Sequence, residues 1–125
     1  MILDTNALSE LLEGNPALEE VMATLGAMVL SPVVLGEFRF GLLRSSKRRE
    51  REATLQEMEA ACEVIPISAK TSRIYAVLRE SLRAKGRPIP ANDLWIASQA
   101  VEHGLPLLSR DDHFLEVGGL NLITW

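Results

Sequence analysis

The sequence predicts an α/β fold, a three-layer α/β/α sandwich around a mainly parallel central sheet of four to five strands. Short apolar runs alternate with amphipathic helical stretches along the whole chain. The boundaries between them carry helix caps, prolines or glycines. Alternating strands and helices are typical of a parallel sheet covered by helices. A length of 125 residues suits one domain, so we expect residues 1–125 to fold as a single unit.

The first half of the chain predicts two strands and four helices. Asn15-Pro16 and Ser31-Pro32 each place a capping side chain before a proline at the first helical position. The glycine at residue 14 ends the first helix. The expected order is strand 1–3, helix 5–13, helix 16 to about 26, strand 27–31, helix 32 to about 44, and helix 47–61.

The second half predicts the remaining strands and two long helices. Ser68 caps a helix whose apolar stripe faces the core and which ends at Gly86. Two prolines make 87–92 (RPIPAN) a loop, because proline and the residue before it resist helix formation. The order is strand 62–67, helix 69–85, helix 91–103, strand 106–109, a turn or short helix 110–114, and strand 120–124.

Composition excludes several classes of protein. No apolar run is long enough to cross a bilayer and the start does not resemble a secretion signal, so we expect a cytoplasmic protein without membrane contact. Cys62 is the single cysteine, which excludes an internal disulfide and a thiolate metal cluster. His103 and His113 lack helical zinc spacing, so no histidine-based metal site is expected.

The net charge of −4 argues against a protein that binds nucleic acid over its whole surface. Two segments are nevertheless strongly cationic, RSSKRRER at 44–51 and RESLRAKGR at 79–87. Each is either a solvated helix face or a local contact for phosphates.

Acidic residues fall at related places in the predicted fold. Asp4 follows the first strand, Glu37 lies in the helix after the second, Asp93 begins a late helix, and Asp111 follows the fourth strand. Each has a structural alternative, since Asp4, Asn92 or Asp93, and Asp111 or Asp112 could be helix caps. Together at one sheet edge they would require a hard divalent cation, Mg²⁺ or Mn²⁺, which suits phosphodiester hydrolysis.

Glu37 is the most informative of these acids. Its helical neighbours include Val34 and Phe40, so its carboxylate leaves from a largely apolar face. Gly36 and Gly41 in the same helix suggest a close backbone approach, because glycine is unfavourable inside helices. The alternatives are a core glutamate satisfied by hydrogen bonds, or a glutamate at the edge of the helix.

The segments ILDTNAL, VVLGEFRFGLL, PANDLWIASQA and LLSRDDHF resemble, in order, the four acidic motifs of PIN-domain nucleases, especially the VapC-type ribonuclease toxins of prokaryotic toxin–antitoxin pairs. The resemblance implies a PIN-like fold and a Mg²⁺- or Mn²⁺-dependent endoribonuclease holding one or two ions. Asp4, Glu37 and Asp93 match the core acidic site and Asp111 the fourth acid, with Asp112 as the alternative. The matching polar positions beside the site are Thr5, Asn6, Asn92 and Ser109.

The resemblance also implies partners. They are an RNA substrate, a cognate antitoxin protein and a second copy of the chain in a homodimer. The basic residues that could contact RNA phosphates are Arg44, Lys47, Arg48, Arg49, Arg83, Lys85 and Arg87. Trp95 stands between apolar neighbours, which favours a core or dimer contact over base stacking.

Two other functions remain open at the level of sequence. A non-catalytic PIN-like interaction module would keep the fold without turnover. A phospho-acceptor receiver domain also places acids at the end of a parallel sheet. The receiver is disfavoured, because Asp4 lacks an acidic neighbour and the second and third strands do not end in aspartate.

Overall fold

The computed structural model describes residues 1–125 and contains a five-stranded sheet in the order β3-β2-β1-β4-β5. Every neighbouring pair is parallel, which confirms the predicted sheet. The paired strands are shorter than the predicted apolar runs, and Asp4 and Ser31 start helices directly after β1 and β2. The strands are β1 (Ile2–Leu3), β2 (Val29–Leu30), β3 (Glu63–Val64), β4 (Leu107–Leu108) and β5 (Leu122–Ile123).

Six α-helices and one 3₁₀ helix connect the strands. The predicted caps Asn15, Ser31 and Ser68 are confirmed, since each side chain accepts a backbone N–H of the following helix. None of the helices is both long and apolar enough to cross a membrane. Their bounds are α1 (Thr5–Glu13), α2 (Pro16–Ala23), α3 (Pro32–Leu42), α4 (Arg48–Ala61), α5 (Ala69–Ala84), α6 (Ala91–His103) and η1 (Asp112–Glu116).

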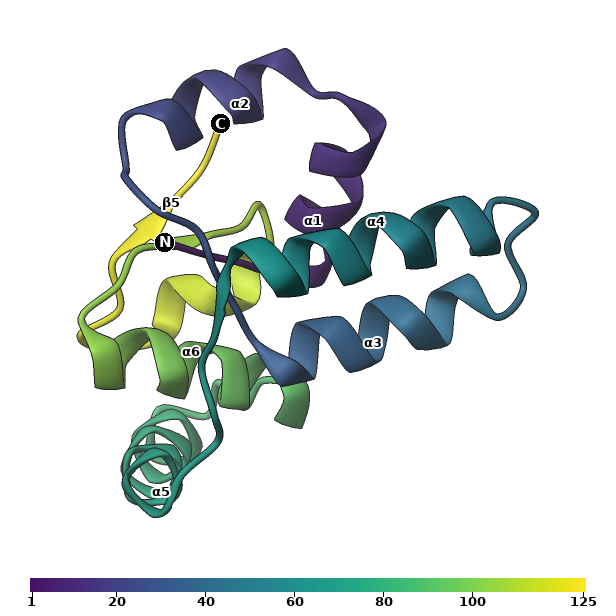
Figure 1. The fold of residues 1–125 in the computed structure, drawn as a ribbon. Coiled ribbons are helices and arrows are strands. Elements are labelled where there is room, and N and C mark those ends of the chain that lie inside the picture. Colours follow the sequence, from purple (N-terminus) through teal and green to yellow (C-terminus); the bar gives the residue numbers. More distant parts are fainter.

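The sheet separates two apolar layers, as the sandwich prediction requires. Leu3 and Leu108 pack with Leu18 of α2, whereas Ile2 and Leu107 belong to the larger core with α3, α5 and α6. This division follows from the strand period of two, which sends successive side chains to opposite faces. Figure 1 shows α2 above the sheet and α5 and α6 below it, with α3 and α4 side by side in a hairpin.

An ion-pair cluster joins the two helices of that hairpin. Arg39 of α3 donates from Nε to Glu52 of α4 at 3.1 Å, and its Nη1 lies 2.6 Å from Glu59. Both glutamates lie on α4, so the cluster fixes the hairpin along its length. The two carboxylates raise the pKa of Arg39 and keep it charged.

A buried amide holds α3 against α6. Gln99 of α6 is fully buried, and its Oε1 accepts from Ser31 Oγ at 2.6 Å. Its Nε2 donates to the carbonyl of Ile65 at 3.0 Å, just after β3. Because a buried amide is costly unless paired, this contact defines the position of α3 relative to α6. These two helices carry two of the predicted acids, Glu37 and Asp93.

Candidate active site

The four predicted acids line one cleft of about 540 Å³, which confirms that they reach the same edge of the sheet. Asp4 and Asp111 come from the chain after β1 and β4, two neighbouring parallel strands whose carboxyl ends meet there. Glu37 and Asp93 come from α3 and α6. Eight of the ten lining residues are polar or charged, and the lining consists of Asp4, Thr5, Asn6, Glu37, Pro90, Ala91, Asn92, Asp93, Asp111 and His113.

Asp4 serves as a helix cap and lines the cleft at the same time. Its Oδ1 accepts the N–H of Ala7 at 2.7 Å, and its Oδ2 accepts from the Ser109 hydroxyl. Burial raises the pKa of Asp4, the hydrogen bonds from Ser109 and Ala7 oppose that rise, and the charges of Asp93 and Asp111 add to it. At the level of sequence, a capping role and a place in the acidic site were alternatives for Asp4. The structure combines them, because the carboxylate that caps the helix also lines the cleft.

Glu37 is half-buried and lacks the partners expected of a core glutamate. Its Oε1 is buried without a hydrogen-bond partner, as is the neighbouring polar atom Thr5 Oγ1 in the cleft. Burial, followed by the charge of Asp93, raises the pKa of Glu37, and the nearby Thr5 hydroxyl opposes that rise. The prediction of a close backbone approach at Gly36 and Gly41 is wrong, because a Cβ at either position would meet no atom within 4 Å. Gly41 instead borders an open groove.

Asp93 is not a helix cap, and neither is Asn92. Helix α6 begins at Ala91 behind Pro90, which makes no side-chain cap, so the capping prediction for both residues is wrong. Pro90 itself occupies the cap position, with φ −55° and ψ 145°, and Asp93 lies in the first turn of the helix. Burial raises the pKa of Asp93, the hydrogen bond from His113 opposes that rise, and the charge of Asp111 adds to it.

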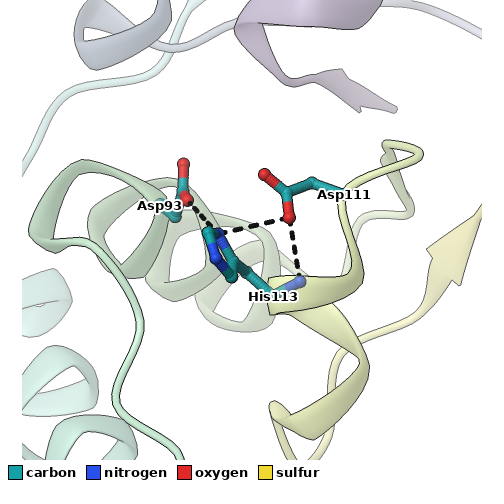
Figure 2. Close-up of side chains that lie close together, drawn as sticks. All are labelled: Asp93, Asp111 and His113. Atoms are coloured by element: carbon teal, nitrogen blue, oxygen red, sulfur yellow. Dashed lines mark hydrogen bonds and ion pairs between the residues drawn. The ribbon is translucent and has the colours of Figure 1, made fainter.

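His113 occupies the space between Asp93 and Asp111, as Figure 2 shows. Its Nδ1 lies 3.2 Å from Asp93 Oδ2 and 3.2 Å from Asp111 Oδ1. Asp111 caps η1 by accepting the N–H of His113 at 2.9 Å, which places the ring. No role for this histidine was expected from the sequence, because His103 and His113 lack helical zinc spacing. Its place two residues after a capping acid was the available signal.

The structure also separates the two adjacent aspartates after β4. Asp111 lines the acidic cleft, whereas Asp112 is exposed and borders a neighbouring hollow of about 330 Å³. Ser109 is fully buried; its hydroxyl bonds Asp4 and accepts the N–H of Asp111 at 2.9 Å. The serine therefore couples the two acids that follow β1 and β4.

Two predicted basic residues lie beside the cleft. Lys47 borders a groove of about 460 Å³ together with Arg51, and this groove shares Thr5 and Glu37 with the acidic cleft. Arg87 borders the 330 Å³ hollow, which shares His113 with the cleft. The groove and the hollow thus each adjoin the cleft, and each is bordered by a basic side chain.

The other predicted basic residues are placed differently. Arg83 pairs with Glu80 at 2.6 Å, and Lys85 donates to the carbonyl of Glu116 at 3.0 Å. Trp95 stacks on Tyr75 at a centroid distance of 4.0 Å and does not line the cleft. Arg44, Arg48 and Arg49 are exposed and, like Arg83 and Lys85, border none of the three hollows.

This arrangement of acids around one edge of a parallel sheet matches a known family. The family model for the PIN domain matches residues 1–120. The chain belongs to the PIN-domain family. The resemblance seen in the four motifs is therefore confirmed, and the receiver-domain alternative is rejected because the whole matched region follows the PIN pattern.

Similar proteins come from several bacteria. This PIN domain is 38% identical to ribonuclease VapC5 of Mycobacterium tuberculosis over 70% of its own length and 66% of that protein. It is 32% identical to VapC ribonuclease Y4jK of Sinorhizobium fredii over 99% of the chain and 96% of that protein. The solved structure of VapBC2 from Rickettsia felis bound to a promoter DNA fragment aligns with a TM-score of 0.86 and 29% identity, covering 99% and 97% of the two chains.

Proposed function

We propose that this PIN domain is a metal-dependent endoribonuclease and the toxin of a toxin–antitoxin pair. The observation that carries the proposal is the acidic cleft, in which the side chains of four separate segments converge. Relatives that align over most of the chain are named VapC ribonucleases, which supports RNA as the substrate class. The alternative of a non-catalytic interaction module requires that this cleft has no turnover.

The donor set fits a divalent cation. Carboxylate oxygens are the ligands that Mg²⁺ and Mn²⁺ prefer, and Glu37 Oε1 is buried without a hydrogen bond of normal geometry. Burial and mutual repulsion raise the pKa values of Asp4, Glu37 and Asp93, which is the situation a cation relieves. We propose that these acids and Asp111 hold one or two Mg²⁺ or Mn²⁺ ions. When bound, such ions activate water and stabilise the leaving oxygen in phosphodiester hydrolysis.

The protein supplies orientation for this chemistry. Ser109 and the N–H of Ala7 hold one oxygen each of Asp4, which fixes the plane of that carboxylate. Gln99 keeps α3 and α6 together and so sets Glu37 opposite Asp93. The remaining polar positions predicted beside the site, Thr5, Asn6 and Asn92, line the cleft and can orient carboxylates or water.

We propose that the RNA strand crosses the acidic cleft between Lys47 on one side and Arg87 on the other. Both border hollows that adjoin the cleft, and cationic side chains there would offset the repulsion between phosphates and carboxylates. Replacing Lys47 or Arg87 by alanine should weaken RNA binding. Each replacement should also reduce the slope of log K against log salt concentration by about one. Arg49→Ala is the matched control, because Arg49 is exposed and borders none of these hollows.

The test of the activity is cleavage of single-stranded RNA by the wild type and Asp93→Asn, in Mg²⁺, Mn²⁺ or excess EDTA. We expect cleavage that requires a metal and falls at least about a hundredfold in the variant, since Asn keeps the shape and removes a ligand charge. Circular dichroism should show both proteins folded. Undiminished cleavage in EDTA would contradict the metal mechanism, and the absence of cleavage in every metal would favour the interaction module.

We further propose a cognate antitoxin and a homodimer as partners. Several similar solved structures are VapBC complexes, which supports an antitoxin for this chain. Purification from the native host followed by sizing of the complex tests both partners. A monomer that copurifies with no second protein would contradict them.

A further inference from the structure

A histidine nitrogen and two carboxylate oxygens form a compact triad in the cleft. The ligand atoms of Asp93, Asp111 and His113 lie within 4.8 Å of one another. His113 Nδ1 is 3.2 Å from an oxygen of each aspartate. Figure 2 shows the ring beneath and between the two carboxylates, with both aspartates directed toward the same space.

These separations are those of ligands that share one ion. In an octahedral site with metal–ligand distances of 2.0–2.1 Å, adjacent ligand atoms are about 3 Å apart. Two of the three edges of the triad are already close to that value. A cation among the three atoms would replace the hydrogen bond between Nδ1 and Asp93, and the neutral ring would then carry its proton on Nε2. The ring is half-exposed and Asp93 and Asp111 line the open cleft, so an ion can reach all three atoms.

The local backbone holds the imidazole in this position. Asp111 accepts the N–H of His113, and the next residue, Phe114, is almost fully buried in the core. The start of η1 is thereby anchored on both sides of the histidine. His113 is thus presented to the cleft by a fixed turn.

We infer that His113 Nδ1 is a direct ligand of the cation held by Asp93 and Asp111. A nitrogen ligand favours a first-row transition metal over Mg²⁺, which is a harder ion and selects oxygen. The histidine therefore biases the site toward Mn²⁺. This inference rests on the proposed metal-dependent function and adds a nitrogen donor to its carboxylates.

Pulsed electron paramagnetic resonance of bound Mn²⁺ tests the inference directly. The wild type should show the ¹⁴N coupling of a ligated imidazole, and His113→Gln should lose it. The glutamine side chain can still hydrogen-bond to the aspartates, so the variant separates ligation from simple orientation of the carboxylates. His103→Gln is the matched control and should keep the signal, because His103 lies at the far end of α6.

Mn²⁺ and Mg²⁺ affinities measured by calorimetry complete the test without using activity. We expect His113→Gln to bind Mn²⁺ at least about tenfold more weakly, with a smaller loss for Mg²⁺. Wild-type Mn²⁺ binding without ¹⁴N coupling would overturn the inference and leave the proposed nuclease intact. Absence of any Mn²⁺ binding that depends on Asp93 would overturn both.

Discussion

Glu37 and Arg39 lie two residues apart on α3 but have opposite electrostatic surroundings. Arg39 meets two glutamates of α4, so its charge is paired on both sides. Glu37 faces Asp4 and Asp93, and one of its oxygens is buried without a donor. One turn of helix therefore carries a charge that stabilises the fold beside a charge that opposes it. The difference indicates that the cleft is arranged for a ligand, whereas the hairpin cluster is arranged for stability.

A large effect on cleavage should distinguish Asp111, an acid of the cleft, from Asp112, the adjacent acid outside it. Asp111→Asn should lower RNA cleavage by about tenfold to a hundredfold, because Asp111 lines the cleft. Asp112→Asn should change cleavage by less than about twofold, since Asp112 is exposed beyond it. Cleavage rates and melting curves of both variants provide the measurement. The opposite ranking would make Asp112 the fourth acid.

The hairpin cluster should show the reverse behaviour, with stability affected and chemistry preserved. Arg39→Met should lower the free energy of unfolding by about 1 kcal/mol, because it leaves Glu52 and Glu59 without their shared partner. The loss should be the same with and without metal. Arg83→Met is the control, since its pair with Glu80 is more exposed and lies within one helical turn. Chemical denaturation in EDTA and in Mg²⁺ measures the free energy of unfolding of both variants. Equal losses would show that the Arg39 cluster contributes no more stability than the exposed pair of Arg83 and Glu80.

Asp4 is expected to contribute both to cleavage and to stability, and two substitutions separate these contributions. Asp4→Asn and Asp4→Ala should both lose cleavage, because each removes the carboxylate charge from the cleft. Asp4→Ala should in addition be about 1 kcal/mol less stable than Asp4→Asn, because only asparagine keeps an oxygen for the N–H of Ala7. Unfolding curves of the two variants supply the comparison. Equal stabilities would mean that the cap contributes little to α1.

The smallest effect should have the opposite sign. The folded-state pKa of Glu37 is raised above the ordinary 4.5, so its stabilising contribution is present below the unfolded pKa and lost as pH rises through the folded pKa. In EDTA at pH 7, Glu37→Gln should therefore be more stable than the wild type, by less than about 1 kcal/mol. The gain should disappear near pH 4. Melting temperatures across this pH range check it, and a destabilised variant at pH 7 would indicate that Glu37 is satisfied in the fold.

The sequence alone was sufficient for the α/β class, most element boundaries and the membership of the acidic set. These features can be predicted from local signals, namely apolar runs, prolines after caps and glycines after helices. Such signals reflect the local energetics of the backbone. Local signals also left open whether Asp93 caps a helix, and the structure excludes that alternative. Whether Asp93 is the cap or the third residue of the helix depends on where the helix starts. The helix starts directly after Pro90, which makes Asp93 its third residue.

Only the tertiary structure decided which charges face one another. His113 joined Asp93 across 20 residues of sequence, and Ser109 joined Asp4 across 105. Likewise, Lys47 and Arg87 differ from Arg49 because of the hollows that they border, although all three lie in cationic segments. The physical reason is that Coulomb and hydrogen-bond energies depend on distance and burial in space. Residue order determines the elements, while the packing of α3 and α6 against the end of the sheet determines the site.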